Sequence, residues 1–103
     1  MPAGRPDLSA VLDQLCAEFL AALPSRMQAV ENAWARLETG DTAAREALVQ
    51  AVHYLVGSGA TFRQPGISQA ARTLEEQVMA GGGAPESGVA LQALRDAVAA
   101  ALA

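Results

Sequence analysis

The chain has 103 residues, of which 51% are hydrophobic and 4% aromatic, and its formal net charge is -4. Its seven cationic residues are all arginines, too few to neutralise many phosphates, so the composition argues against a nucleic-acid partner. A single cysteine and a single histidine exclude an intrachain disulfide and a histidine-rich metal site. The length fits one domain over residues 1–103, and the excess of Ala, Leu, Glu, Gln and Arg predicts an all-α fold.

Two helical segments are predicted in the first 40 residues. The first begins at residue 7 or 9, either of which is a plausible N-cap, and ends near residue 23. Pro24 then breaks or kinks the apolar pattern. The second segment covers residues 27–37 and stops at Gly40.

Three further helices are predicted in the rest of the chain. One covers residues 42–62, and a Pro-Gly turn at 65–66 separates it from the next, at 67–78. Three glycines at 81–83 form a flexible connection, and Ser87 is the candidate cap of the last helix.

Short connections between amphipathic helices predict an antiparallel up-down four-helix bundle with an additional N-terminal helical arm. The first two segments would form one arm that is kinked at Pro24. No apolar run approaches the length of a spanning helix and no signal-peptide core is present, so a soluble, cytoplasmic protein without a membrane partner is expected. The alanine-rich end suggests a domain cut from a longer protein.

The only histidine, His53, is predicted on the outer face of its helix. At 100° per residue it falls about 140° from the centre of the apolar stripe, and Gly57 falls about 180° away. A glycine inside a helix costs about 1 kcal/mol relative to alanine, so it calls for a close approach by another segment. Helix packing explains Gly59, on the inner stripe, but explains the outward Gly57 poorly. An ordinary solvated histidine is the alternative interpretation of His53.

Two segments around this histidine carry a resemblance to a known family. The letters HYLVGSGATF at 53–62 and ISQAARTLE at 67–75 resemble the histidine phosphotransfer (Hpt) domain of two-component phosphorelays. The resemblance implies a four-helix bundle whose histidine accepts a phosphoryl group from a receiver-domain aspartyl phosphate and passes it to another receiver aspartate. It makes His53 the phosphoacceptor and Gly57 the residue that leaves room for the receiver.

Other positions near the histidine are candidate site residues. Gln50, one turn earlier, is expected to hydrogen-bond the ring or the phosphoryl oxygens, with a solvated glutamine as the alternative. Receivers dock on Hpt domains through an apolar patch beside the histidine, which makes Val49, Val56 and Ala60 the candidate docking surface. Many family members carry a lysine at position 56, so its absence predicts slower or more partner-dependent transfer.

An ordinary imidazole is largely neutral at pH 7 and acts as a nucleophile without a separate base. The resemblance therefore implies a phosphohistidine carrier rather than a self-sufficient enzyme, with no metal or cofactor of its own and with Mg²⁺ on the receiver. The implied partner is a response-regulator receiver domain, in cis or in trans, including that of a hybrid histidine kinase. Two alternatives stay open: a degenerate Hpt-fold module that docks on a receiver without carrying phosphate, and a structural bundle in which His53 is incidental.

The apolar periodicity also predicts the surroundings of four other residues. Glu75 and Glu76, with Arg72, are predicted to form a solvated helix face. Met79 is predicted either at the rim of the docking surface or in the core.

Overall fold

The computed structural model describes residues 7–81 and 84–103, without the side chains of 84–86. These residues form four α-helices and no strand, which confirms the predicted all-α fold. The helices are α1 (Leu8–Glu38), α2 (Ala44–Thr61), α3 (Pro65–Met79) and α4 (Ala84–Leu102).

The first two predicted segments form one helix that contains Pro24, as expected for a single arm, so of the two alternatives at Pro24 the break is wrong. Proline removes one backbone N–H from the helical hydrogen bonds. Here Pro24 is exposed, and the buried side chains of Leu23 and Met27 on either side pack into the core, which offsets the lost bond. At the start of α1, the Asp7 carboxylate accepts a hydrogen bond from the Ser9 N–H at 3.0 Å.

Two other helix starts also differ from their predicted positions. Pro65 is the first residue of α3 rather than part of the preceding turn, a position where its missing N–H would have no helical partner in any case. Ser87 lies inside α4, which begins at Ala84, and its side chain is buried. It is therefore not the cap of the last helix. The predicted glycine connection at 81–83 lies in part outside the described residues.

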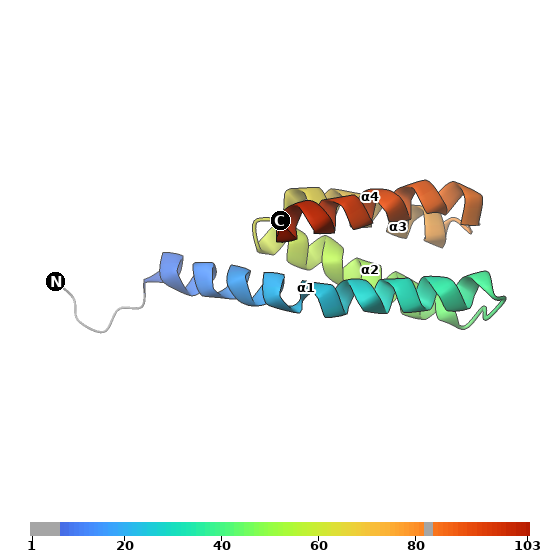
Figure 1. The fold of residues 1–103 in the computed structure, drawn as a ribbon, viewed down its shortest axis with the longest axis horizontal. Helices are drawn as coiled ribbons and strands as arrows, with labels where there is room; N and C mark the ends of the chain where they lie inside the picture. The colour runs from blue at the N-terminus through green and yellow to red at the C-terminus, as the bar shows by residue number, and fades with distance from the viewer. Residues whose placement is uncertain (1–6, 82–83) are drawn as a thin grey trace.

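The four helices lie along the length of the molecule (Figure 1). Helix α2 contacts α1 and α3, while α4 contacts α3 and α1, so that the four helices share one core. The stripe predicted on α2 faces this core. Its fully buried large side chains come from every helix: Leu23, Val30, Leu48, Val52, Leu55, Ile67, Leu74, Val78, Leu91 and Leu94.

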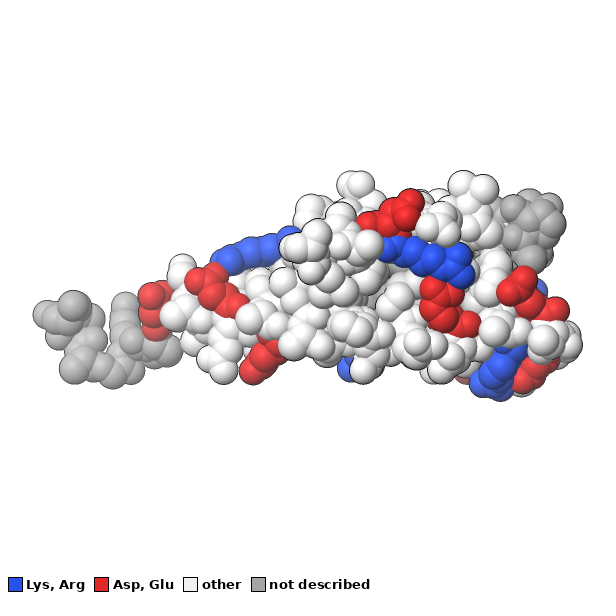
Figure 2. Space-filling view, viewed as in Figure 1, with Lys and Arg blue, Asp and Glu red and all other residues white. Residues whose placement is uncertain are grey.

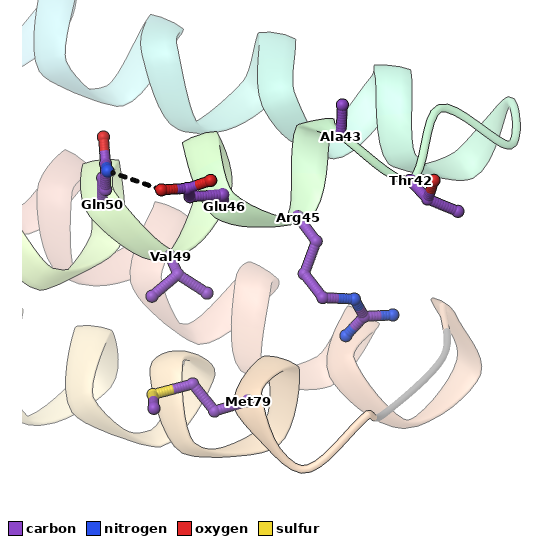
Figure 3. A pocket seen from close by; sticks show the side chains of 7 residues that line it. All are labelled: Thr42, Ala43, Arg45, Glu46, Val49, Gln50 and Met79. Carbon is purple, nitrogen blue, oxygen red and sulfur yellow. Dashed lines mark hydrogen bonds between the residues drawn. The ribbon is translucent and has the colours of Figure 1, made fainter.

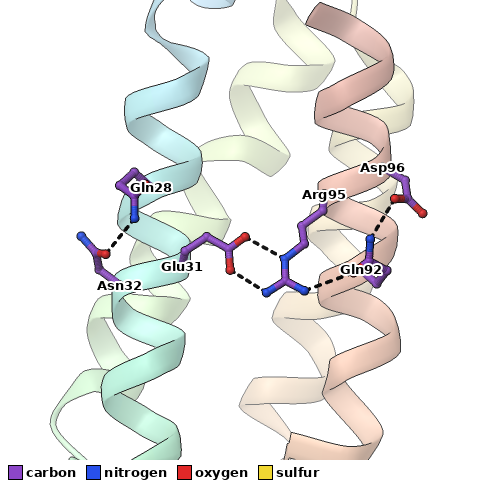
Figure 4. A network of polar contacts seen from close by, with 6 residues as sticks. All are labelled: Gln28, Glu31, Asn32, Gln92, Arg95 and Asp96. Carbon is purple, nitrogen blue, oxygen red and sulfur yellow. Dashed lines mark hydrogen bonds and ion pairs between the residues drawn. The ribbon is translucent and has the colours of Figure 1, made fainter.

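An ion pair joins the first and last helices (Figure 4). Arg95 of α4 donates from Nε and Nη2 to the two carboxylate oxygens of Glu31 on α1, both at 2.7 Å. Its Nη1 also donates to Gln92 at 3.1 Å. The hydrogen bonds from Arg95 hold the pKa of Glu31 below its usual range. The contact joins α4 to the C-terminal half of α1.

The first turns of α1 extend beyond the other three helices (Figure 1). Their apolar side chains, Leu8, Val11 and Leu15, are exposed. An 18-residue window of α1 reaches a mean hydropathy of 1.2, with 11% of it buried, so by length and composition alone this helix could span a membrane. This finding corrects the expectation that no segment reaches the length of a spanning helix. One such helix near an N-terminus is weak evidence of a membrane span, because core helices of soluble proteins reach the same length and hydropathy.

Candidate functional site

Helix α2 presents His53 to solvent at its middle. The core-facing residues Val52 and Leu55 are fully buried, and the rotation between successive helix positions places His53 on the opposite side. Its side chain is 74% exposed. Gly57, one turn later, is also exposed. The predicted outward positions of both residues are therefore confirmed.

Helix α3 supplies a partner for the imidazole. The Nδ1 atom of His53 lies 2.6 Å from Oε2 of Glu75, whose side chain is only 15% exposed. The neighbouring Leu74 is buried in the core and holds this part of α3 in place. An ionised carboxylate only accepts hydrogen bonds, so in the neutral form of the imidazole this contact assigns the proton to Nδ1 and the lone pair to Nε2.

This contact corrects the prediction that Glu75 belongs to an ordinary solvated face. Periodicity places Glu75 on the outside of α3 but does not say which residue of α2 it meets, since that depends on how the two helices cross. The one signal in the sequence was the Leu-Glu pair shared with the family pattern.

An apolar hollow surrounds the histidine between α2 and α3. Six residues line it, and we call it the His53 pocket: Val49, Gln50, His53, Tyr54, Glu75 and Met79. A second hollow continues toward the start of α2, and Figure 3 shows Val49 of α2 and Met79 of α3 pointing toward each other there. Met79 is exposed and Val49 is half-buried, so both offer apolar surface beside the imidazole.

The remaining predicted site residues divide into three cases. Gln50 lines the pocket, but its Nε2 donates to Oε1 of Glu46 at 3.4 Å rather than to the imidazole. Ala60 is exposed, as a docking residue should be. Val56 is only 9% exposed and belongs to the core, so its assignment to the docking surface is wrong.

The burial of Val56 follows from the close packing of α2 on α3. The hydroxyl of Ser68 on α3 donates to the carbonyl of Val56 at 2.7 Å. A Cβ atom placed on Gly59 would lie 2.9 Å from the Ser68 backbone nitrogen. Glycine at position 59 therefore lets the two backbones approach, and the approach covers the side of α2 that carries Val56.

An arginine on α1 is a further neighbour of the pocket that the sequence did not reveal. The guanidinium carbon of Arg26 lies 4.0 Å from the ring centroid of Tyr54. Tyr54 follows His53 in the chain and lines the same pocket. No periodicity on α2 could have identified this contact, because it joins residues 28 positions apart on two helices.

Charged groups show no concentration that would bind a polyanion on the face seen in Figure 2, where acidic and basic side chains are interspersed. Within residues 7–81 and 84–103, no group of three or more His, Cys, Asp or Glu side chains is arranged to hold a metal ion.

Comparison with known proteins adds one match. The family described as the Hpt domain matches residues 14–103, which is most of the chain and includes all the site residues above. No curated protein and no solved structure matched. Hpt domains act in phosphotransfer in two-component systems and interact with the receiver domains of response regulators. The chain therefore belongs to the Hpt domain family.

Proposed function

We propose that this chain is a phosphorelay carrier whose His53 accepts a phosphoryl group from a receiver-domain aspartyl phosphate and passes it to another receiver aspartate. One observation carries the proposal: an exposed imidazole whose Nδ1 atom is hydrogen-bonded to a nearly buried carboxylate. This contact leaves the Nε2 atom as the nucleophile and fixes the ring on α2.

The transfer exchanges one bond to phosphorus for another. The Nε2 lone pair of His53 attacks the phosphorus atom, the N–P bond forms as the P–O bond to the aspartate breaks, and the aspartate leaves as a carboxylate. The ring becomes positively charged while Nδ1 keeps its proton, and the Glu75 carboxylate stabilises that charge. In the second transfer, a receiver carboxylate attacks the phosphorus atom and the N–P bond breaks, which restores the neutral imidazole.

The receiver is proposed to dock over α2 and α3 beside the histidine. Val49 and Met79 supply apolar contact, while Gly57 and Ala60 keep the surface low enough for a large partner to reach His53. The receiver brings the aspartate and its Mg²⁺, and this chain adds no metal or cofactor. The receiver can be attached in cis or in trans, including that of a hybrid histidine kinase.

Two further parts of the proposal concern the setting of the domain. An antiparallel up-down bundle with α1 as an N-terminal arm would hold α2 and α3 rigidly beneath the docking partner. A cytoplasmic location would place the chain with the receivers it serves.

A degenerate docking module is the second candidate. The observation in its favour is Val56, an apolar buried residue where many Hpt domains carry a lysine beside the phosphoryl group. In that case the chain would bind a receiver through the same surface without accepting phosphate.

The deciding experiment offers a panel of phosphorylated receiver domains to the wild-type chain and to His53→Gln. Acid-labile phosphate on the wild type alone is the expected result. Receiver binding without label would favour the docking module. Absence of both binding and label, in a chain with a helical circular-dichroism spectrum, would contradict both functions.

A further inference from the structure

A phosphoryl group on His53 would enter surroundings that already hold a negative charge. Its nearest charged neighbour is the carboxylate of Glu75, hydrogen-bonded to the same ring. Position 56 cannot offset this charge, because Val56 is uncharged and buried against α3. A cation that pairs with the phosphoryl oxygens would therefore have to come from another part of the fold.

Most arginines in the described part of the chain already form an ion pair or a hydrogen bond with another residue. Arg36, Arg63 and Arg95 form ion pairs with carboxylates, and Arg45 donates to the carbonyl of Val78 at 2.6 Å. Among the side chains that the structure describes, Arg26 and Arg72 are the two arginines with neither a carboxylate nor a backbone carbonyl as a partner. The position of Arg26 sets it apart from Arg72.

Arg26 contacts Tyr54, one of the residues that line the His53 pocket. Its guanidinium lies over the ring of Tyr54, the residue next to His53, and Tyr54 lines the pocket together with the imidazole. Arg26 comes from α1 and Glu75 from α3, so the cation and the carboxylate approach α2 from two different neighbouring helices. The guanidinium of Arg26 and the carboxylate of Glu75 therefore do not compete for the same position beside the imidazole.

The contact with Tyr54 leaves the guanidinium free to change partners. A cation over an exposed aromatic ring is held more weakly than a guanidinium that makes two hydrogen bonds to phosphate. Arg26 is exposed, and an arginine can exchange an aromatic ring for a phosphoryl group by rotation about its own side-chain bonds.

We propose that Arg26 is the phosphate-binding cation of this Hpt domain and pairs with the phosphoryl group on His53 in place of the lysine that position 56 lacks. The inference rests on the proposed function in taking His53 as the residue that carries phosphate. It places the cation on α1, whereas the family pattern places it on the helix of the histidine.

The test compares Arg26→Gln with Arg72→Gln, a control that removes the same charge from another exposed position. His53 is phosphorylated with phosphoramidate, which needs no receiver, and the ³¹P resonance of the phosphohistidine is titrated. We expect Arg26→Gln to raise the pH at which the phosphoryl group on His53 loses its proton. In Arg72→Gln this pH should be the same as in the wild type. Arg26→Lys should restore most of the difference, because it keeps the charge.

If the phosphoryl group titrates at the same pH in Arg26→Gln and in Arg72→Gln, the inference is wrong. A parallel transfer from a phosphorylated receiver separates this failure from failure of the proposed function. If phosphoramidate labels His53 and no receiver does, the carrier function fails while the titration still decides the role of Arg26. If neither donor labels the folded wild type, both proposals fail.

Discussion

Gly57 and Gly59 lie two positions apart on α2, and a methyl group would meet open space at the first and the backbone of α3 at the second. A Cβ atom on Gly57 has no atom within 4 Å, whereas one on Gly59 would lie 2.9 Å from the Ser68 nitrogen and 3.0 Å from the Gln64 carbonyl oxygen. The two glycines therefore serve different purposes. Gly59 is required by the fold, whereas no contact within the described part of the chain requires Gly57.

The first prediction concerns Gly59→Ala. The added methyl group would push α2 and α3 apart, since backbone atoms cannot move as a flexible side chain can, and we expect a loss of about 1–3 kcal/mol in the free energy of unfolding. Urea denaturation measures the loss. A variant as stable as the wild type would show that α2 and α3 do not pack this closely.

The second prediction concerns Gly57→Ala, the matched control for Gly59→Ala. Alanine is the better helix former, so we expect this variant to gain about 0.5–1 kcal/mol in stability. If the glycine leaves room for a receiver over His53, the same variant should bind the receiver more slowly and accept phosphate from it more slowly. A more stable variant with unchanged transfer would show that the docking partner does not approach position 57.

The third prediction concerns Glu75→Gln. The neutral amide would still accept a hydrogen bond from Nδ1 of His53, but it would stabilise the positively charged ring less, so phosphotransfer should slow about tenfold. Initial rates of label transfer from a phosphorylated receiver measure the effect. Glu76→Gln, an exposed neighbour on α3, is the control and should transfer as the wild type does. Equal rates in the two variants would remove Glu75 from the mechanism.

The fourth prediction concerns the apolar rim of the His53 pocket. Met79 is 68% exposed and Val89 of α4 is 77% exposed, so serine at either position should change stability by no more than about 0.5 kcal/mol. We expect Met79→Ser to weaken receiver binding about fivefold to tenfold, because a buried contact is lost, while Val89→Ser binds normally. Calorimetric titration with a receiver distinguishes the two. Equal affinities would place the docking surface elsewhere.

The fifth prediction concerns the ion pair between α1 and α4. Arg95 lowers the pKa of Glu31, so this carboxylate adds stability above the ordinary carboxyl range and loses it as the pH falls through the lowered pKa. Since the Arg95 side chain is 40% exposed, solvent screening limits the contribution to at most about 1 kcal/mol.

Glu31→Gln should therefore be less stable than the wild type at pH 7, and the difference should disappear in acid below the lowered pKa. Denaturation curves measured at a series of pH values from 7 downward provide the measurement. Glu18→Gln, an exposed carboxylate on α1, is the control and should change stability little at either pH. A difference that persists in acid would mean that the ion pair is not its source.

The sequence predicted more about α2 than about any other helix. Its length, its buried stripe and the outward direction of His53 and Gly57 all followed from the period of the apolar residues. The prediction for Val56 was wrong because this residue lies at the border of the stripe, where the approach of α3 decides burial.

The first helix shows a feature that the sequence could not predict. Pro24 was a sound reason to expect a break or a kink, since the local propensity of proline is strongly against a helix interior. The packing of Leu23 and Met27 against the other helices outweighs that propensity, and packing energy is not a local property.

By itself, the sequence determined the all-α class, the buried face of α2, and the outward direction of His53, the proposed phosphoacceptor. These features depend on spacing within one helix, where 3.6 residues per turn fix every direction. Only the tertiary structure decided that Glu75 contacts the imidazole and that Arg26 lies over the ring of Tyr54. Both contacts join different helices, and their partners are set by how the helices cross and by their relative register, which no pattern within a single helix contains.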